Sequence, residues 1–328
     1  MKTMTRRWGA IAAASALALG LAACAPTAEE PTDDGAATEW PEEIVLGLVP
    51  SQEVDQLVLD AEVLGDLLSE ELGITVRAEV TDSYNALVVA MQSGQAAIGM
   101  FGPIALVQAA DQAGAEPILQ SVRFGSSTYV TQWFTNDPDR FCETEVVLDE
   151  DGFAFCNGVL DAESGPVGES ALALIEQDEA ISFVDEGSAS GYYYPATQLE
   201  EAGLDPFALS GSFFAGGHPN SVLSVARGDA TVGVSFNDAR GNVVEELPTV
   251  GEDVVVFAWS TAIPNDGVAV AGDLPQDLKD AITEAFLAIA DSEEGLAALD
   301  AVYSIEGLVP ADLDALDAAR QVEANFGE

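Results

Sequence analysis

Hydrophobic and polar positions follow two different periods along this chain. Short apolar runs, which are typical of buried strands, recur between residues 44 and 271. Between them, apolar residues recur every three or four positions, as at Leu57, Ala61, Leu64 and Leu68, which predicts amphipathic helices. Regular alternation of strands and helices predicts an α/β fold with mostly parallel sheets.

The individual elements can be placed from the same pattern. The strands are predicted at residues 44–49, 74–80, 97–100, 117–122, 129–135, 180–184, 211–214, 231–235, 254–259 and 267–271. The helices are predicted at residues 54–68, 84–91, 104–112, 191–202, 219–227, 238–246 and 276–290.

The N-terminus has the pattern of an export signal. An apolar stretch at residues 8–21, too short to span a bilayer, follows three basic residues, Lys2, Arg6 and Arg7. It ends in Leu-Ala-Ala-Cys, which resembles the bacterial lipobox. We therefore predict that residues 1–23 are a signal peptide and that Cys24 carries lipid, anchoring the chain at the extracytoplasmic face of the cell membrane. An ordinary secretory signal with an incidental cysteine is the alternative.

Residues 24–41 are predicted to be a flexible acidic tether. They are rich in Ala, Pro, Thr, Asp and Glu and have almost no large apolar side chains, so they cannot bury enough surface to fold. The remainder of the chain is long enough for two lobes and a sizeable core.

The charge balance is strongly acidic. The chain has 57 acidic and 10 basic residues, which gives a formal charge of −47. Loss of the three basic residues of the predicted signal peptide would change this charge to −50. A field of that sign excludes nucleic acid and anionic lipid surfaces as natural partners. Because the acids are spread along the whole chain, we interpret them mainly as a solubility feature.

The three cysteines fit an exported protein. With Cys24 lipidated, Cys142 and Cys156 remain as the possible pair, and outside the cytoplasm they are expected to form a structural disulfide. A metal site would require further soft ligands, and the chain has one histidine.

Common catalytic motifs are missing. The sequence has no Gly-x-Ser-x-Gly, no phosphate-loop Gly-Lys-Ser/Thr and no His-Glu-x-x-His. We therefore predict a binding protein rather than an enzyme, without cofactor or metal. In open α/β sheets, ligands bind at the carboxyl ends of strands, where helix N-termini favour anions.

An ordered set of short motifs resembles the phosphate/phosphite/phosphonate substrate-binding proteins of ABC transporters. The set covers most of residues 44–290 and comprises Asp-Ser-Tyr-Asn-Ala-Leu at 82–87, Met-Gln-Ser-Gly-Gln-Ala-Ala-Ile-Gly at 91–99, Phe-Gly-Pro at 101–103, Ser-Ala-Ser-Gly-Tyr at 188–192, Gly-His at 217–218 and Asn-Asp at 237–238.

The resemblance implies a two-lobed periplasmic-binding fold of the second type, which closes on its ligand like a clamp. Lobe one would comprise residues 42–125 and 262–328, and lobe two residues 126–261, with hinge crossings near 126–134 and 256–262. A disulfide-stapled insertion at 138–168 would belong to lobe two.

The same resemblance implies which residues bind the ligand. Ser188 and Ser190, at a predicted helix start, would donate hydrogen bonds to an oxyanion together with free backbone N–H groups. Ala189 replaces the family's threonine and retains only its N–H group. Read without the family, these serines are ordinary helix N-caps.

His218 and Asp238 are the chemically informative candidates. His218 would donate from a ring nitrogen, although a lone histidine is more often structural. Asp238 would accept the proton of a monoprotonated phosphorus oxyanion and so reject sulfate. Its alternative role is a helix N-cap.

Four further residues are placed near the cleft by topology: Tyr84, Ser51, Phe101 and Tyr129. Tyr84 and Tyr129 could equally pack in the core.

The resulting hypothesis is a monomeric lipoprotein that captures a phosphonate, phosphite or phosphate for an ABC permease. Two alternatives remain at this stage. One is a receptor of the same fold for another small anion, or a ligand sensor. The other is an extracellular hydrolase with an acidic pair.

Overall fold

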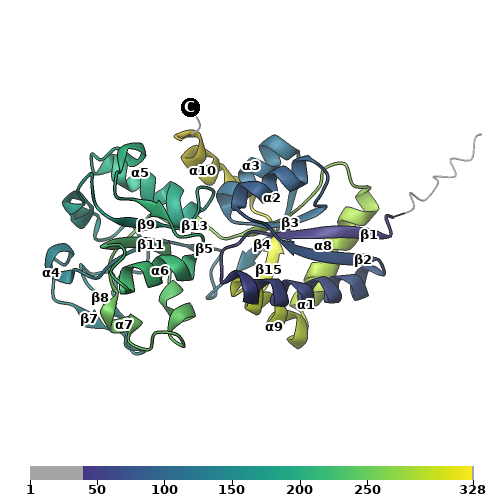
Figure 1. Ribbon diagram of the computed structural model, residues 1–328. Coiled ribbons are helices and arrows are strands. Elements are labelled where there is room, and N and C mark those ends of the chain that lie inside the picture. The colour runs from purple at the N-terminus through teal and green to yellow at the C-terminus, as the bar shows by residue number, and fades with distance from the viewer. Residues whose placement is uncertain (1–39, 327–328) are drawn as a thin grey trace, which may run out of the picture. The chain divides into compact units, whose positions relative to one another are not determined.

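The computed structural model describes residues 40–326 (Figure 1). The predicted signal peptide, Cys24 and nearly all of the predicted tether lie outside these residues. Among the described helices, none combines the length and the apolar character that a membrane crossing requires.

Lobe one is built on a six-stranded sheet to which both ends of the described chain contribute. Its strand order is β15-β4-β14-β3-β1-β2. The strands are β1 (Glu43–Leu48), β2 (Thr75–Val80), β3 (Ile98–Phe101), β4 (Glu116–Val122), β14 (Gly267–Val270) and β15 (Gly307–Pro310). β1 pairs in parallel with β2 and β3, whereas β14 and β15 pair antiparallel with their neighbours.

Helices cover both faces of this sheet. In Figure 1, α1 (Val54–Leu72) and α9 (Glu293–Tyr303) lie on one face, and α2 (Tyr84–Gln92) and α3 (Pro103–Ala113) lie on the other. The helix α8 (Gln276–Ala290) packs against α1 and α9. Of the predicted apolar positions of α1, Leu57, Ala61, Leu64 and Leu68 are buried, and each buried leucine contributes about 1.5–3 kcal/mol. Val54 and Val58, at the start of the same predicted helix, are exposed. α1 ends at Gly73, whose left-handed conformation is easy for glycine.

Lobe two is built on a seven-stranded sheet of order β10-β9-β11-β6-β12-β8-β7. Its strands are β6 (Thr131–Thr135), β7 (Val147–Leu148), β8 (Ala154–Phe155), β9 (Ile181–Phe183), β10 (Phe213–Phe214), β11 (Val232–Phe236) and β12 (Val255–Trp259). Its helical segments are α4 (Pro138–Phe141), η1 (Glu169–Leu174), η2 (Ala189–Tyr193), α5 (Tyr194–Glu201), η3 (Pro206–Ala208), α6 (His218–Ala226), η4 (Ala239–Val243) and α7 (Val250–Asp253).

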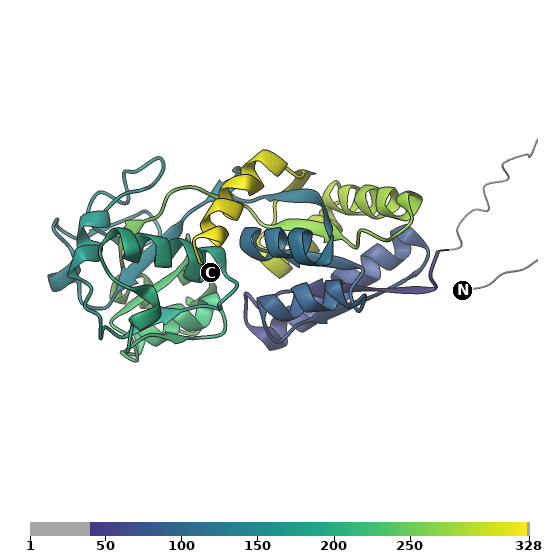
Figure 2. The same cartoon turned by 90° about the horizontal axis from the view of Figure 1, so that it is seen from above.

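The chain crosses twice between the two sheets. The first crossing contains β5 (Thr128–Tyr129) and the second contains β13 (Ile263–Pro264), and these two strands pair antiparallel with each other. The predicted lobe limits, 125/126 and 261/262, fall inside these crossings. The helix α10 (Leu313–Ala324) ends the described chain and packs on α3 and η2 (Figure 2).

The predicted α/β class is confirmed, but the prediction of mostly parallel sheets is wrong. Within the two large sheets, five of the eleven strand pairings are parallel. The physical reason is the crossing itself: β14 and β15 follow the return of the chain from lobe two and enter the first sheet in the opposite direction. A hydrophobic run fixes burial and leaves strand direction undetermined.

Cys142 and Cys156 are paired in lobe two, with Cα atoms 5.6 Å apart. Cys156 is buried beside Phe141, in the core of this lobe. The pair closes the segment that carries β7 and β8, at the end of the sheet remote from β10.

Candidate functional site

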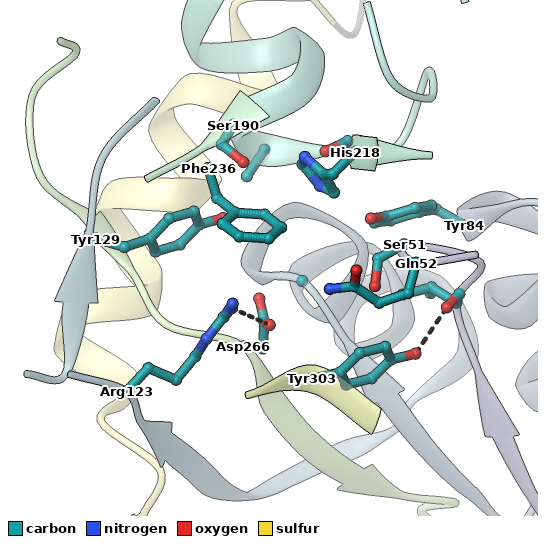
Figure 3. Close-up of a pocket in the computed structure, with 14 residues that line it drawn as sticks. Ser51, Gln52, Tyr84, Arg123, Tyr129, Ser190, His218, Phe236, Asp266 and Tyr303 are labelled. Atoms are coloured by element: carbon teal, nitrogen blue, oxygen red, sulfur yellow. Dashed lines mark hydrogen bonds and ion pairs between the residues drawn. The ribbon is translucent and has the colours of Figure 1, made fainter. Parts of the chain in front are cut away.

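A small cavity lies between the two lobes, about 20 Å³ as measured by the centre of a water-sized sphere (Figure 3). Its lining comes from both sides of the crossings: Val49, Ser51, Gln52, Tyr84, Gly102, Arg123, Tyr129, Ser188, Ala189, Ser190, His218, Phe236, Asp266 and Tyr303. In this conformation the cavity has room for a group of a few atoms and none for a nucleotide or a peptide.

Strand ends and helix starts position these residues. Ser51 and Gln52 follow β1, Arg123 follows β4, and Phe236 ends β11. Tyr84 and His218 are the first residues of α2 and α6. Because the first N–H groups of a helix have no partner within it, helix starts around a cavity favour an anion.

The Ser188–Ser190 segment forms one wall of the cavity. Ser188 caps η2, and its hydroxyl accepts a hydrogen bond from the Gly191 N–H at 3.1 Å. Ser188, Ala189 and Ser190 are all at most 2% exposed. The N-cap role and the cavity role therefore coexist in Ser188, whereas Ser190 lines the cavity from within η2.

His218 is buried and neutral. Its Nδ1 lies 2.8 Å from the Ser235 hydroxyl, and its backbone N–H donates to the Ser51 carbonyl, across the cleft, at 3.0 Å. Burial, helped by the positive charge of Arg123, lowers the pKa of His218 to about 3. If Ser235 donates to Nδ1, the neutral ring carries its hydrogen on Nε2 and can donate it to a ligand.

A pH-dependent cost of folding follows from the neutral His218. Because the unfolded chain binds a proton near pH 6.5 and the folded chain does not, stability should fall as the pH drops from about 6.5 towards about 3. His218→Gln lacks this proton and should lose less stability over the same range. Thermal unfolding of both proteins in steps from pH 7 to pH 4 measures the difference, and parallel curves would contradict the assignment.

One ion pair supplies the formal charges of the cavity. Arg123 Nη1 lies 3.0 Å from Asp266 Oδ2, and both side chains are largely buried. Burial raises the pKa of Asp266, while the charge and hydrogen bond of Arg123 oppose the rise. Arg123 is the one cationic group in the lining when His218 is neutral.

Three tyrosines remain protonated donors. Burial raises the pKa of Tyr84, of Tyr129 and of Tyr303 above its ordinary value. The Tyr303 hydroxyl donates to the Val49 carbonyl at 2.7 Å and so fixes the loop after β1 (Figure 3). Tyr84 and Tyr129 present their hydroxyl groups to the cavity from opposite sides.

Seven of the nine ligand-contact residues proposed from sequence line the cavity: Ser51, Tyr84, Tyr129, Ser188, Ala189, Ser190 and His218. The structure leaves two outside it. Phe101 is 1% exposed and turns back beneath Gly99 into the core of lobe one, so its neighbour Gly102 reaches the cavity instead.

Asp238 is also outside the cavity. Its carboxylate caps η4 through the Arg240 N–H and pairs with the Arg240 guanidinium at 2.6 Å. Arg240 is fully buried and needs this counter-charge. The N-cap alternative agrees with the structure, and Phe236, two residues earlier, occupies the cavity end of β11.

Two missed residues of the cavity, Arg123 and Asp266, are charged, and the sequence carries a distinguishing signal for the first alone. Arg123 is one of ten basic residues in the chain and directly follows a predicted strand. Asp266 directly precedes another predicted strand, but it is one of 57 acids and nothing local distinguishes it. Among residues 40–326, no cluster of three or more His, Cys, Asp or Glu is arranged to hold a metal ion.

Comparisons with known proteins agree with this architecture. A family described as ABC transporter, phosphonate, periplasmic substrate-binding protein matches residues 46–316. The phosphate-import protein PhnD of Mycolicibacterium smegmatis is 25% identical over 271 residues, which are 80% of this chain and 76% of that protein.

Two solved structures show the same fold at low identity. A binding protein component of an ABC phosphonate transporter from Pseudomonas aeruginosa superposes with a TM-score of 0.69 at 19% identity, covering 86% of this chain and 85% of the other. PhnD1 from Prochlorococcus marinus, in complex with methylphosphonate, gives a TM-score of 0.70 at 17% identity, covering 87% and 98%.

Proposed function

This chain belongs to the phosphonate family of ABC-transporter periplasmic substrate-binding proteins, and on that premise we propose that its inter-lobe cavity captures a small phosphorus oxyanion for import. Phosphite, phosphate and methylphosphonate are the ligands that we propose. The protein would deliver them, as a monomer, to the permease of an ABC transporter.

The convergence of donors on the small cavity carries this proposal. Hydroxyl groups of Tyr84, Tyr129 and Ser190 surround it, and Arg123 provides one positive charge. A tetrahedral oxyanion accepts several hydrogen bonds in different directions, which matches such a set, and a charge-assisted bond from arginine adds to them.

Contacts between the lobes support a clamp. His218 bonds to Ser51 across the cleft, and the Asn242 side chain donates to the Gln52 side chain at 2.6 Å. Both pairs join lobe one to lobe two beside the cavity. A ligand that bonds to both lobes would add to these contacts and favour the closed arrangement.

Titration calorimetry tests the proposal. The purified protein is titrated with phosphite, phosphate, methylphosphonate, 2-aminoethylphosphonate and sulfate. We expect tight binding of at least one of the first three and weak binding of sulfate. Tight binding of an unrelated solute, with none of the phosphorus compounds bound, would overturn the proposed ligand class.

Lipid anchoring at Cys24 is a separate proposal, because that residue lies outside the described part of the chain. We expect Cys24→Ala to move the protein from the membrane fraction to the soluble extracytoplasmic fraction, since the lipid could no longer attach. Labelled fatty acid should be incorporated by the native protein and not by the variant. Cys142→Ala, which keeps Cys24, is the matched control and should remain in the membrane fraction.

A further inference from the structure

A second cavity lies directly behind one wall of the ligand cavity. This outer pocket measures about 240 Å³, against about 20 Å³ for the ligand cavity. The two share three lining residues: Arg123, Tyr129 and Phe236. Given the proposed function, on which this inference rests, we propose that Phe236 limits the size of the substituent on phosphorus and that the outer pocket is the space beyond that limit.

The shared wall is a rigid stack. The Phe236 ring lies 4.6 Å from the His218 ring, centre to centre, and the Arg123 guanidinium lies over the Phe236 ring, 5.0 Å from its centre. Arg123 is in turn held by Asp266. Phe236 is 6% exposed, so its ring cannot turn aside without breaking these contacts.

The orientation of the ligand follows from where the donors lie. Figure 3 shows Tyr129, Phe236 and Arg123 on one side of the cavity and Tyr84, Ser51 and Gln52 on the other. The three oxygens of a phosphonate should face the donors of both sides, the Arg123 guanidinium and the Tyr129 hydroxyl included, because an unpaired buried donor costs about 1–3 kcal/mol. The carbon substituent is then left to face the Phe236 ring, which is apolar.

A substituent longer than methyl would therefore meet Phe236. An extra methylene group that does not fit a pocket typically costs about 10-fold to 200-fold in selectivity. Beyond the ring, the outer pocket offers Phe124 and Trp259 as apolar surface and Glu163 as a negative charge. That lining suits an alkyl or aminoalkyl chain.

The experiment is calorimetry on the intact protein with methyl-, ethyl-, propyl- and 2-aminoethylphosphonate. For the native protein we expect affinity to fall at least about 10-fold between methyl and ethyl. Phe236→Ala should bind propyl- and 2-aminoethylphosphonate at least about 10-fold more tightly than the native protein does, and methylphosphonate no more tightly. Phe236→Leu, which removes less side-chain volume and disturbs folding less, should give a smaller gain with the same ligands.

Two further variants test whether the gain in affinity arises from the outer pocket. Adding Ala162→Trp to Phe236→Ala refills the outer pocket and should abolish the gain for the longer ligands. Phe207→Ala removes an exposed phenylalanine that lines neither cavity and should leave the whole series unchanged.

The failure of this inference is distinct from that of the proposed function. If the native protein binds methylphosphonate but Phe236→Ala and Phe236→Leu, folded by circular dichroism, gain nothing for longer ligands, Phe236 sets no size limit. Equal affinity of the native protein for methyl- and propylphosphonate would also contradict the proposed size limit. If the native protein binds no phosphorus oxyanion at all, the proposed function itself is wrong.

Discussion

Arg123→Ala is expected to weaken binding of phosphate or methylphosphonate by about 10-fold to 150-fold, since a hydrogen bond to a charged group is worth about 1.5–3 kcal/mol. The residue supplies the one positive charge of a cavity whose histidine is neutral. Its removal also leaves the Asp266 carboxylate without a partner, facing the anion. Calorimetry with each ligand measures the loss.

Three controls separate this effect from general damage. Arg227→Ala removes an exposed positive charge of lobe two, paired with Glu246, and should leave affinity unchanged. Arg123→Lys keeps the positive charge but loses the planar guanidinium group. Its affinity for the ligand should lie between that of the native protein and that of Arg123→Ala. In Arg123→Ala with Asp266→Asn, no buried carboxylate repels the ligand, so part of the affinity should return. Full affinity in Arg123→Ala would remove Arg123 from the site.

Much of the fold could be predicted from the sequence because the local pattern of apolar and polar residues indicates which side chains are buried. The run at 44–49 and the stripe of Leu57, Leu64 and Leu68 appear as β1 and α1. Long-range pairing is not local. The antiparallel entry of β14 beside β3 depends on the path of the chain through lobe two. α9, β15 and α10 follow the last predicted element, and no pattern was assigned to them from the sequence.

The site was partly predictable for a similar reason. Ser188, Ser190 and His218 belong to local motifs at helix starts, and helix starts around a cavity are recognisable in sequence. Arg123 and Asp266 are 143 residues apart, and only the crossings bring them together. Asp238 lies outside the cavity, and the buried Arg240 guanidinium pairs with its carboxylate.

Because Asp266 lines the cavity and Asp238 pairs with Arg240, we expect Asp266 to be the acid that distinguishes protonated oxyanions. Phosphate and phosphonate carry, or can accept, one proton at neutral pH, and that proton can lie between a ligand oxygen and the Asp266 carboxylate. Sulfate has no such proton at neutral pH. It would face the carboxylate with an unpaired acceptor and a like charge, which costs about 1–3 kcal/mol or more.

Asp266→Asn should accordingly bind sulfate roughly 100-fold more tightly than the native protein at pH 8, since the amide can donate a hydrogen bond and carries no charge. The variant should also bind phosphorus ligands less selectively over sulfate. Calorimetry with sulfate and methylphosphonate, run side by side, measures the change in the ratio of the two affinities.

The pH dependence of sulfate binding tests the role of the Asp266 carboxylate independently. Burial raises the pKa of Asp266, so its carboxyl group takes up a proton more readily as the pH falls. Sulfate affinity of the native protein should therefore rise from pH 8 towards pH 5, and that of Asp266→Asn should stay nearly constant. Asp238→Asn, a matched loss of a carboxylate outside the cavity, should lower stability through Arg240 but keep the native discrimination. If Asp238→Asn and not Asp266→Asn admitted sulfate, the discriminating acid would be the one expected from sequence, and the cavity geometry would be misassigned.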